Sequence, residues 1–221
     1  MKTVRQVVIS VLGAHGLLFN TVWADEEQGK WSANAAYTSE YYYRGILQKE
    51  SSASAGIDYE YGGADLGVWT ADVGDGLEVD VFGGYTVALG ELSLRGGFTG
   101  YYYTGEFDDT YQELNASLAW RGFRLEYSKG QYENFDKPSM DYGFLDIAYA
   151  FESGFYGRYG RFTDEFEGDF IELGYGVELN GFDVSVAAIV NSEELSDQAD
   201  ASGNPTSGEA IIFTLSKGFD W

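Results

Sequence analysis

Apolar and polar residues alternate with a period of two along this chain, most clearly over residues 170–191. Ile171 and Leu173 fall on one face of an extended strand there, and Glu172 falls on the other. Asn180-Gly181 divides the stretch and is a dipeptide that type I′ hairpin turns prefer. Each arm has about ten residues, the length that a tilted strand needs to cross a bilayer. The stretch therefore predicts a β-hairpin of membrane-spanning length.

The same alternation recurs over most of residues 30–221 and predicts about twelve strands. Short turns are expected at 62–63, 90–91, 121–122, 152–154 and 180–181, and longer loops at 45–51, 105–110, 130–139, 164–169 and 192–208, with the short connection at 74–76 on the loop side. At 64–73 and 155–162 apolar residues fall on both faces, so the number of strands is least certain to follow from the pattern there. Transmembrane barrels have short periplasmic turns and longer outer loops.

We therefore predict an all-β fold, a closed antiparallel transmembrane β-barrel of about twelve strands embedded in outer-membrane lipid. An even number of strands places both ends of the barrel in the periplasm. A soluble β-sandwich is the alternative, but the strands of sandwiches are usually shorter, about five or six residues long.

The first residues predict export. Lys2 and Arg5 precede an apolar run at 7–19, and Val22-Trp23-Ala24 supplies the small residues of a cleavage site. We expect a secretory signal peptide over residues 1–24, cut after Ala24, and an outer-membrane barrel over residues 25–221.

The last residues alternate as well, with Ile211, Phe213, Leu215, Phe219 and Trp221 in phase. This segment resembles the C-terminal strand of bacterial outer-membrane proteins, which the barrel-assembly machinery recognises. The usual last residue is Phe, so Trp221 departs from the pattern. The resemblance implies the assembly machinery as a partner.

Tyrosines near strand ends, among them Tyr41, Tyr43, Tyr101 and Tyr103, are expected in the aromatic girdles of the barrel.

Composition narrows the chemistry. The leader carries Lys2, Arg5 and the only histidine, His15, so its removal changes the net charge from −23 to −25 and leaves no histidine. The chain has no cysteine, which excludes a disulfide scaffold and a Cys/His metal site. The acidic surface repels nucleic acid. No cofactor or metal is expected.

The charged residues that fall opposite the apolar faces are predicted to line the lumen. They are Glu40, Arg44, Asp58, Glu60, Glu78, Asp80, Arg95, Glu113, Arg121, Arg124, Glu126, Glu172, Glu178 and Asp183. With ten acids and four arginines, this set fits a polar conduit that prefers cations. It fits equally a network of ion pairs that fills the lumen. Arg44-Gly45 is expected to end a strand, with Gly permitting the turn.

Three functions follow from this set. The leading one is a channel for passive diffusion of small polar solutes, preferring cations. The second is a structural or adhesive barrel whose lumen is occluded and whose outer loops bind a partner. The third is a lipid-modifying enzyme built on acid pairs such as Glu78/Asp80 and Glu172/Glu178. Such pairs are what any lumen wall shows, and no histidine remains for a Ser-His mechanism, so we do not expect an enzyme.

The first third of the mature chain resembles a known family. Tyr43-Arg44-Gly45-Ile46 followed by Gln48 is similar to the signature of the TorF-like porin family. The resemblance continues in Gly56-Ile57-Asp58-Tyr59, in Gly67-Val68-Trp69 and from Leu77 to Tyr85. Leu47 and Ser52-Ala53-Ser54 depart from the family pattern, which usually has Ser after Gly-Ile. What the resemblance implies is an outer-membrane β-barrel with porin function and no named substrate.

Overall fold

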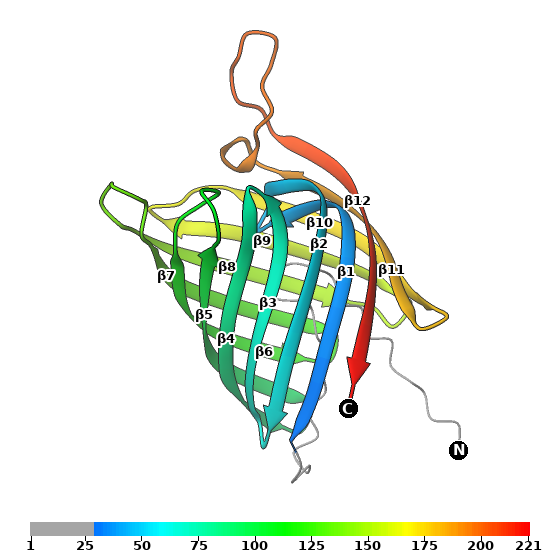
Figure 1. Ribbon diagram of the computed structural model, residues 1–221. Coiled ribbons are helices and arrows are strands. Elements are labelled where there is room, and N and C mark those ends of the chain that lie inside the picture. Colours follow the sequence, from blue (N-terminus) through cyan, green and yellow to red (C-terminus); the bar gives the residue numbers. More distant parts are fainter. Residues whose placement is uncertain (1–28) are drawn as a thin grey trace.

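The computed structural model describes residues 29–221, which form one closed antiparallel barrel of twelve strands (Figure 1). The strands are β1 (Lys30–Tyr43), β2 (Ile46–Tyr61), β3 (Ala64–Gly74), β4 (Gly76–Leu89), β5 (Leu92–Tyr103), β6 (Tyr111–Trp120), β7 (Phe123–Tyr132), β8 (Met140–Ala150), β9 (Phe155–Asp164), β10 (Asp169–Leu179), β11 (Phe182–Asn191) and β12 (Gly208–Asp220). Each strand pairs with its neighbours in sequence, and β1 closes the ring with β12. The predicted fold is confirmed. The expected signal peptide lies outside the described residues.

The short turns lie together at the end of the barrel that carries the C-terminus (Figure 1). Asn180 and Gly181 have φ angles of 55° and 77°, and Gly62 and Gly63 have 57° and 90°. Positive φ at both central residues is the signature of a type I′ turn, whose twist matches that of the flanking strands. These dipeptides therefore fix the register of β10–β11 and of β2–β3.

The longer loops lie at the opposite end, and the longest joins β11 to β12. It contains a three-residue 3₁₀ helix, η1 (Glu193–Leu195), and an isolated bridge between Ala199 and Pro205. The side chain and backbone of Asn204, together with the Ser202 N–H, donate hydrogen bonds that hold the pKa of Asp200 below its usual value. Among residues 29–221, no helix has the length and apolar character needed to span a bilayer.

The two faces of each strand divide as expected, with large apolar side chains outside. Leu114, Leu173 and Phe213 are 70%, 62% and 60% exposed. In β3, whose sequence has mixed faces, Leu66 and Val68 point outward while Trp69 is buried inside. Both faces of β3 carry apolar side chains, and this is why its sequence has no single apolar face. An apolar exterior on a closed barrel is the arrangement that suits lipid.

Leu173→Arg should cost on the order of 2–4 kcal/mol of folding free energy, because the charge would face lipid near mid-strand. Gly174, on the inner face, is not a suitable control, since an added Cβ would lie 2.2 Å from the Tyr156 ring. Ser185→Arg, on the inner face of β11 and half-buried, is the better one and should cost much less. Equal losses in a urea titration would contradict the assignment of faces.

Candidate functional site: the barrel lumen

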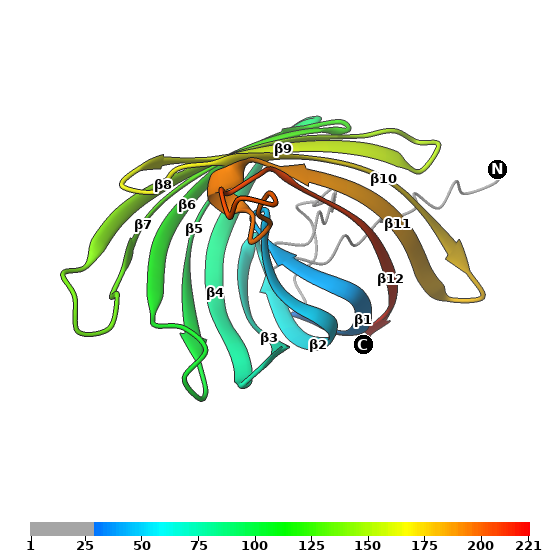
Figure 2. The ribbon, with the colours of Figure 1, turned by 90° about the horizontal axis from the view of Figure 1, so that it is seen from above.

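The outer half of the β1–β2 hairpin leaves the barrel wall and enters the lumen. Pairing of β1 with β12 ends at Thr38, and pairing of β2 with β3 begins at Ser54, yet β1 and β2 stay paired up to Tyr43 and Ile46. Seen from above, β1 turns toward the middle of the barrel while β12 follows its rim (Figure 2). We call residues 39–53 the inner hairpin. The loop predicted at 45–51 is therefore wrong, because residues 46–51 form the start of β2 and only Gly45 belongs to the turn.

Local sequence explains the bend and the tight tip. Thr38 and Tyr41 are both buried although their positions differ by three, and the register with β2 shifts between Tyr41 and Tyr42. The tip is a two-residue turn in which Arg44 has φ 49° and Gly45 has φ 86°. A Cβ on Gly45 would lie 2.7 Å from the Phe170 ring, so this position needs glycine for space and for its backbone angle.

The centre of the site is a buried ion pair between Arg44 and Glu113 of β6. Both guanidinium nitrogens donate to the carboxylate at 2.8 Å, and the two side chains are 3% and 0% exposed. Glu113 also accepts hydrogen bonds from the hydroxyls of Tyr101 and Tyr142, each at 2.9 Å. The guanidinium carbon of Arg44 lies 4.4 Å from the centre of the Phe144 ring. A buried pair this well satisfied holds the tip of the inner hairpin against the opposite wall.

A second contact joins the inner hairpin to β4. The Tyr41 hydroxyl donates to Glu78 at 2.9 Å, and Asp80 is the next residue on the same inner face. Glu78 and Asp80 are both fully buried, and neither forms an ion pair in the described part of the chain. On the far side, the Asn191 side chain donates to the Gly45 carbonyl at 2.7 Å. The hairpin is thus bound to three parts of the wall.

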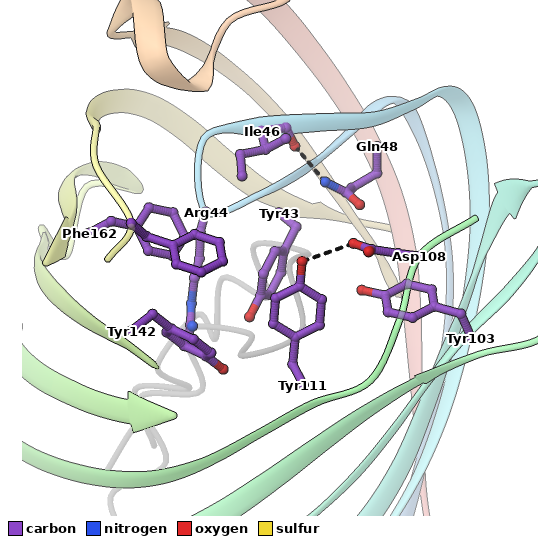
Figure 3. A pocket seen from close by; sticks show the side chains of 10 residues that line it. Tyr43, Arg44, Ile46, Gln48, Tyr103, Asp108, Tyr111, Tyr142 and Phe162 are labelled. Carbon is purple, nitrogen blue, oxygen red and sulfur yellow. Dashed lines mark hydrogen bonds between the residues drawn. The ribbon is translucent and has the colours of Figure 1, made fainter. Parts of the chain in front are cut away.

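Aromatic side chains close the outer mouth around this tip. Tyr111 and Tyr132 stack with their centroids 4.3 Å apart, and both hydroxyls donate to Asp108. Phe166, from the β9–β10 loop, packs against Tyr142 at 5.5 Å. Figure 3 shows several of these side chains around a small cavity of about 70 Å³. That volume holds a few water molecules.

Below the inner hairpin, an arginine cluster crosses β7, β8 and β9. Arg124 contacts Asp146 at 2.7 Å and Glu126 at 3.3 Å, and Arg158 contacts Asp146 at 2.5 Å. Glu172 accepts from the Tyr156 hydroxyl at 2.6 Å. The carboxylates of Glu126 and Asp146 are thus paired with arginines within the cluster.

Nearer the short turns, the inner face is more acidic. Glu60 lies directly opposite Asp65, and Glu178 lies directly opposite Asp183. Asp65 has an ion pair with Arg95. Asp58, Glu60, Glu178 and Asp183 form no ion pair within residues 29–221. Like charges directly opposite one another are unfavourable unless water or counter-ions screen them.

Three predictions about single residues need correction. Arg121 does not line the lumen: it occupies the β6–β7 turn with φ 54°, 63% exposed, and pairs with Glu91. Glu40 does not line the wall of the lumen: it lies on the inner hairpin, half-buried and directly opposite Glu50. The outward position expected for the tyrosines is wrong for Tyr41 and Tyr101, which are 2% and 0% exposed inside the barrel.

Several residues of the site are not predicted by the sequence pattern, namely Asp65, Asp146, Arg158 and Tyr142. Asp146 carries a usable signal, because it alternates with the outward-facing Leu145 and Ile147. The sequence gives no such signal for Arg158, because its strand has apolar residues on both faces.

A closed antiparallel barrel that is apolar outside and charged inside defines the class of transmembrane β-barrels. Within that class, the chain belongs to the family described as bacterial protein of unknown function (Gcw_chp), whose model matches residues 26–204. A bacterial protein with this fold resides in the outer membrane, which such barrels span. No curated protein matches the chain.

Several solved structures are similar to this chain. A structure titled "Unveiling the Mechanism Behind the in-meso Crystallization of Membrane Proteins" has 8% identity and a TM-score of 0.54, over 87% of this chain and 84% of that one. The outer-membrane protein OpdK of Pseudomonas aeruginosa has 15% identity and a TM-score of 0.39, with 78% of this chain covered. OprD of the same organism has 15% identity, 78% coverage of this chain and a TM-score of 0.40. The chain spans 58% of the length of OpdK and 60% of that of OprD.

Proposed function

We propose that this protein is an outer-membrane channel for small polar solutes, and that the inner hairpin controls its passage. The observation that carries the proposal is the hairpin itself, which leaves a barrel wall of twelve strands and is held in the lumen only by non-covalent contacts such as Arg44–Glu113. The barrel is closed where the inner half of β1 pairs with both β12 and β2, and a barrel of twelve strands encloses a wide lumen when the hairpin moves. Planar-bilayer recordings test this, and openings in the native protein are expected.

A second candidate is a structural or adhesive barrel with a permanently occluded lumen. It is favoured by the complete burial of the Arg44–Glu113 pair and by the small volume of the remaining cavity. Under this alternative, the recordings show no openings whatever the state of the hairpin. We propose no catalytic role. The proposed relationship to the TorF-like porin family rests on the motifs around Tyr43-Arg44-Gly45-Ile46.

We further propose that the open channel prefers cations. The in-register acid pairs Glu60/Asp65 and Glu178/Asp183 gather negative charge at the periplasmic end of the lumen, and a single arginine, Arg95, pairs with one of them. Acids in a narrow passage concentrate counter-ions. Reversal potentials across a KCl gradient should therefore have the sign of cation selectivity at low salt. The preference should fade toward roughly 1 M, where screening acts over about 3 Å.

Neutralising one acid pair tests the origin of this selectivity. Glu178→Gln with Asp183→Asn should move the reversal potential toward zero, because it removes two lumen charges. Glu91→Gln is the matched control, since Glu91 lies at the same end of the barrel but 65% exposed in a turn. Anion selectivity in the native protein, or an equal shift in the control, would refute the proposal.

A further inference from the structure

Two acids of β4 are buried among apolar and aromatic side chains of the lumen. Glu78 and Asp80 are both 0% exposed. Across the sheet, Glu78 lies between Ala71 of β3 and Tyr103 of β5. Asp80 lies beside Trp69 of β3. Trp69 and Ala71 belong to one buried apolar cluster, against which Tyr103 packs. Neither neighbouring strand therefore brings a positive charge to the two carboxyl groups.

The other groups that surround the pair do not neutralise it. The titratable and charged side chains that face it are Tyr41 and Arg44 of the inner hairpin, Tyr101 and Tyr103 of β5, Asp108 of the β5–β6 loop and Glu113 of β6. Arg44 is the one cation in this set, and both of its terminal nitrogens donate to Glu113 at 2.8 Å. Two further acids thus face the pair, while the nearby cation is engaged elsewhere.

Three of the four carboxyl oxygens have no hydrogen-bond donor. Glu78 Oε1 accepts from the Tyr41 hydroxyl at 2.9 Å, whereas Glu78 Oε2 and both oxygens of Asp80 are buried without a partner in the described part of the chain. The two carboxyl groups lie within hydrogen-bonding reach of each other, but two ionised carboxylates have no proton to donate. Adjacent carboxylates that are buried without a cation are not both ionised. A proton on one of them supplies the missing donor.

A metal cation is the other way to neutralise such a pair, and the structure does not favour it. Ca²⁺ takes about six to eight oxygen ligands. Within residues 29–221, no three acid, histidine or cysteine side chains are grouped so that they could hold a metal ion. A shared proton needs only one donor and one acceptor, which Glu78 and Asp80 supply by themselves.

We propose that Glu78 and Asp80 form a proton-binding site that seats the inner hairpin. One carboxyl group keeps a proton at neutral pH and donates a hydrogen bond to the other, while Glu78 accepts from Tyr41 of the hairpin. The proton favours the seated hairpin at lower pH, and this contribution is lost as the pH rises and the proton leaves. Two adjacent charges then lie beneath Tyr41, so alkaline pH releases the hairpin. The inference goes beyond the proposed channel, because it requires no conduction through the lumen.

Infrared spectroscopy tests whether the pair holds a proton. Exposed Asp and Glu ionise near about pH 4, so at about pH 8 the carbonyl band of a protonated carboxyl, which shifts in D₂O, comes only from a perturbed acid. The native protein should show this band, and Glu78→Gln with Asp80→Asn should remove it. Asp58→Asn with Glu60→Gln is the matched control and should keep it, because these acids are also two residues apart on the inner face of one strand but only half-buried.

The distance between two spin labels tests the seating of the hairpin. Gln48→Cys on the inner hairpin and Leu114→Cys on the outer face of β6, which is 70% exposed, give two labelling sites in a chain without cysteine. Residues 29–221 contain no histidine either, so no side chain with an ordinary pKa titrates there between about pH 6 and about pH 9. The native protein should show one distance population at the lower pH and a second that grows several-fold at the higher pH. With Glu78→Gln and Asp80→Asn, whose amides stay neutral, the first population should persist at both.

Absence of the protonated band from the native protein would overturn the site. If added Ca²⁺ then shifted the carboxylate bands of the native protein but not those of the Gln/Asn variant, the pair would bind a cation instead. A protonated band together with identical distances at both pH values would overturn the seating of the hairpin. A pH-dependent distance that persists in the variant would assign the effect to another group. Both measurements on the native chain decide the matter even if the variant does not fold. None of these outcomes depends on channel conductance, so failure here and failure of the proposed channel are distinguishable.

Discussion

Replacing Arg44 by alanine should lower the free energy of unfolding by about 3–5 kcal/mol, because it removes the bidentate, buried ion pair that Arg44 forms with the Glu113 carboxylate. Glu113 is fully buried, and the hydroxyls of Tyr101 and Tyr142 and the amide of Asn115, which also donate to it, are neutral groups. The loss is measured by urea unfolding in detergent or lipid vesicles.

Arg95→Ala is the matched control, since Arg95 also forms a bidentate pair, with Asp65, but both partners remain about a quarter exposed. We expect a loss of about 1 kcal/mol there, because water screens the charge that is left. The double variant Arg44→Met with Glu113→Leu should recover most of the loss, since it removes both buried charges. Similar losses for Arg44→Ala and Arg95→Ala would show that the inner hairpin does not hold a buried ion pair.

Removing the inner hairpin should raise single-channel conductance on the order of tenfold, because a barrel of twelve strands then has its full width open. Replacing residues 40–50 by Asn-Gly joins Ser39 to Ser51 through a type I′ turn at the height where the hairpin leaves the wall. Thr38 and Ser52 are already paired there, so the shortened strands keep their register.

The control replaces residues 196–206 of the β11–β12 loop by the same Asn-Gly. It removes the same number of residues but keeps Leu195, which belongs to the buried cluster. Its conductance should match that of the native protein. If shortening the inner hairpin left the conductance unchanged, some other part of the chain would block the lumen.

Alternation along the sequence is sufficient to predict the strands and most of their faces. Leu173 and Glu172 occupy neighbouring positions on one strand, and burial separates them as their polarity predicts. Asn180-Gly181 and Gly62-Gly63 carry the turn chemistry in their own residue types, because few other residues adopt positive φ. Such local signals are sufficient when one face meets lipid and the other meets a polar lumen.

The inner hairpin cannot be predicted in the same way, for a physical reason. Tyr41 and Tyr43 alternate in the same way whether their face looks toward lipid or toward the lumen, and a tyrosine suits both. The polar residues that follow Gly45 are typical of a loop, and only their pairing with the end of β1 makes them a strand. Arg44 binds Glu113, which lies 69 residues further along the chain. No local pattern encodes such a contact.

The central claim, that the inner hairpin lies in the lumen and limits passage, is tested most directly by tethering it in place. Tyr43 and Tyr101 have ring centroids 5.3 Å apart, so Tyr43→Cys with Tyr101→Cys can be joined by a short reducible cross-linker in a chain that has no other cysteine. Single-channel recordings follow the cross-linked protein before and after reduction. The account predicts a closed channel while the tether is intact and openings once it is reduced. Openings of the same size in both states would contradict it, and so would a channel that stays closed after reduction.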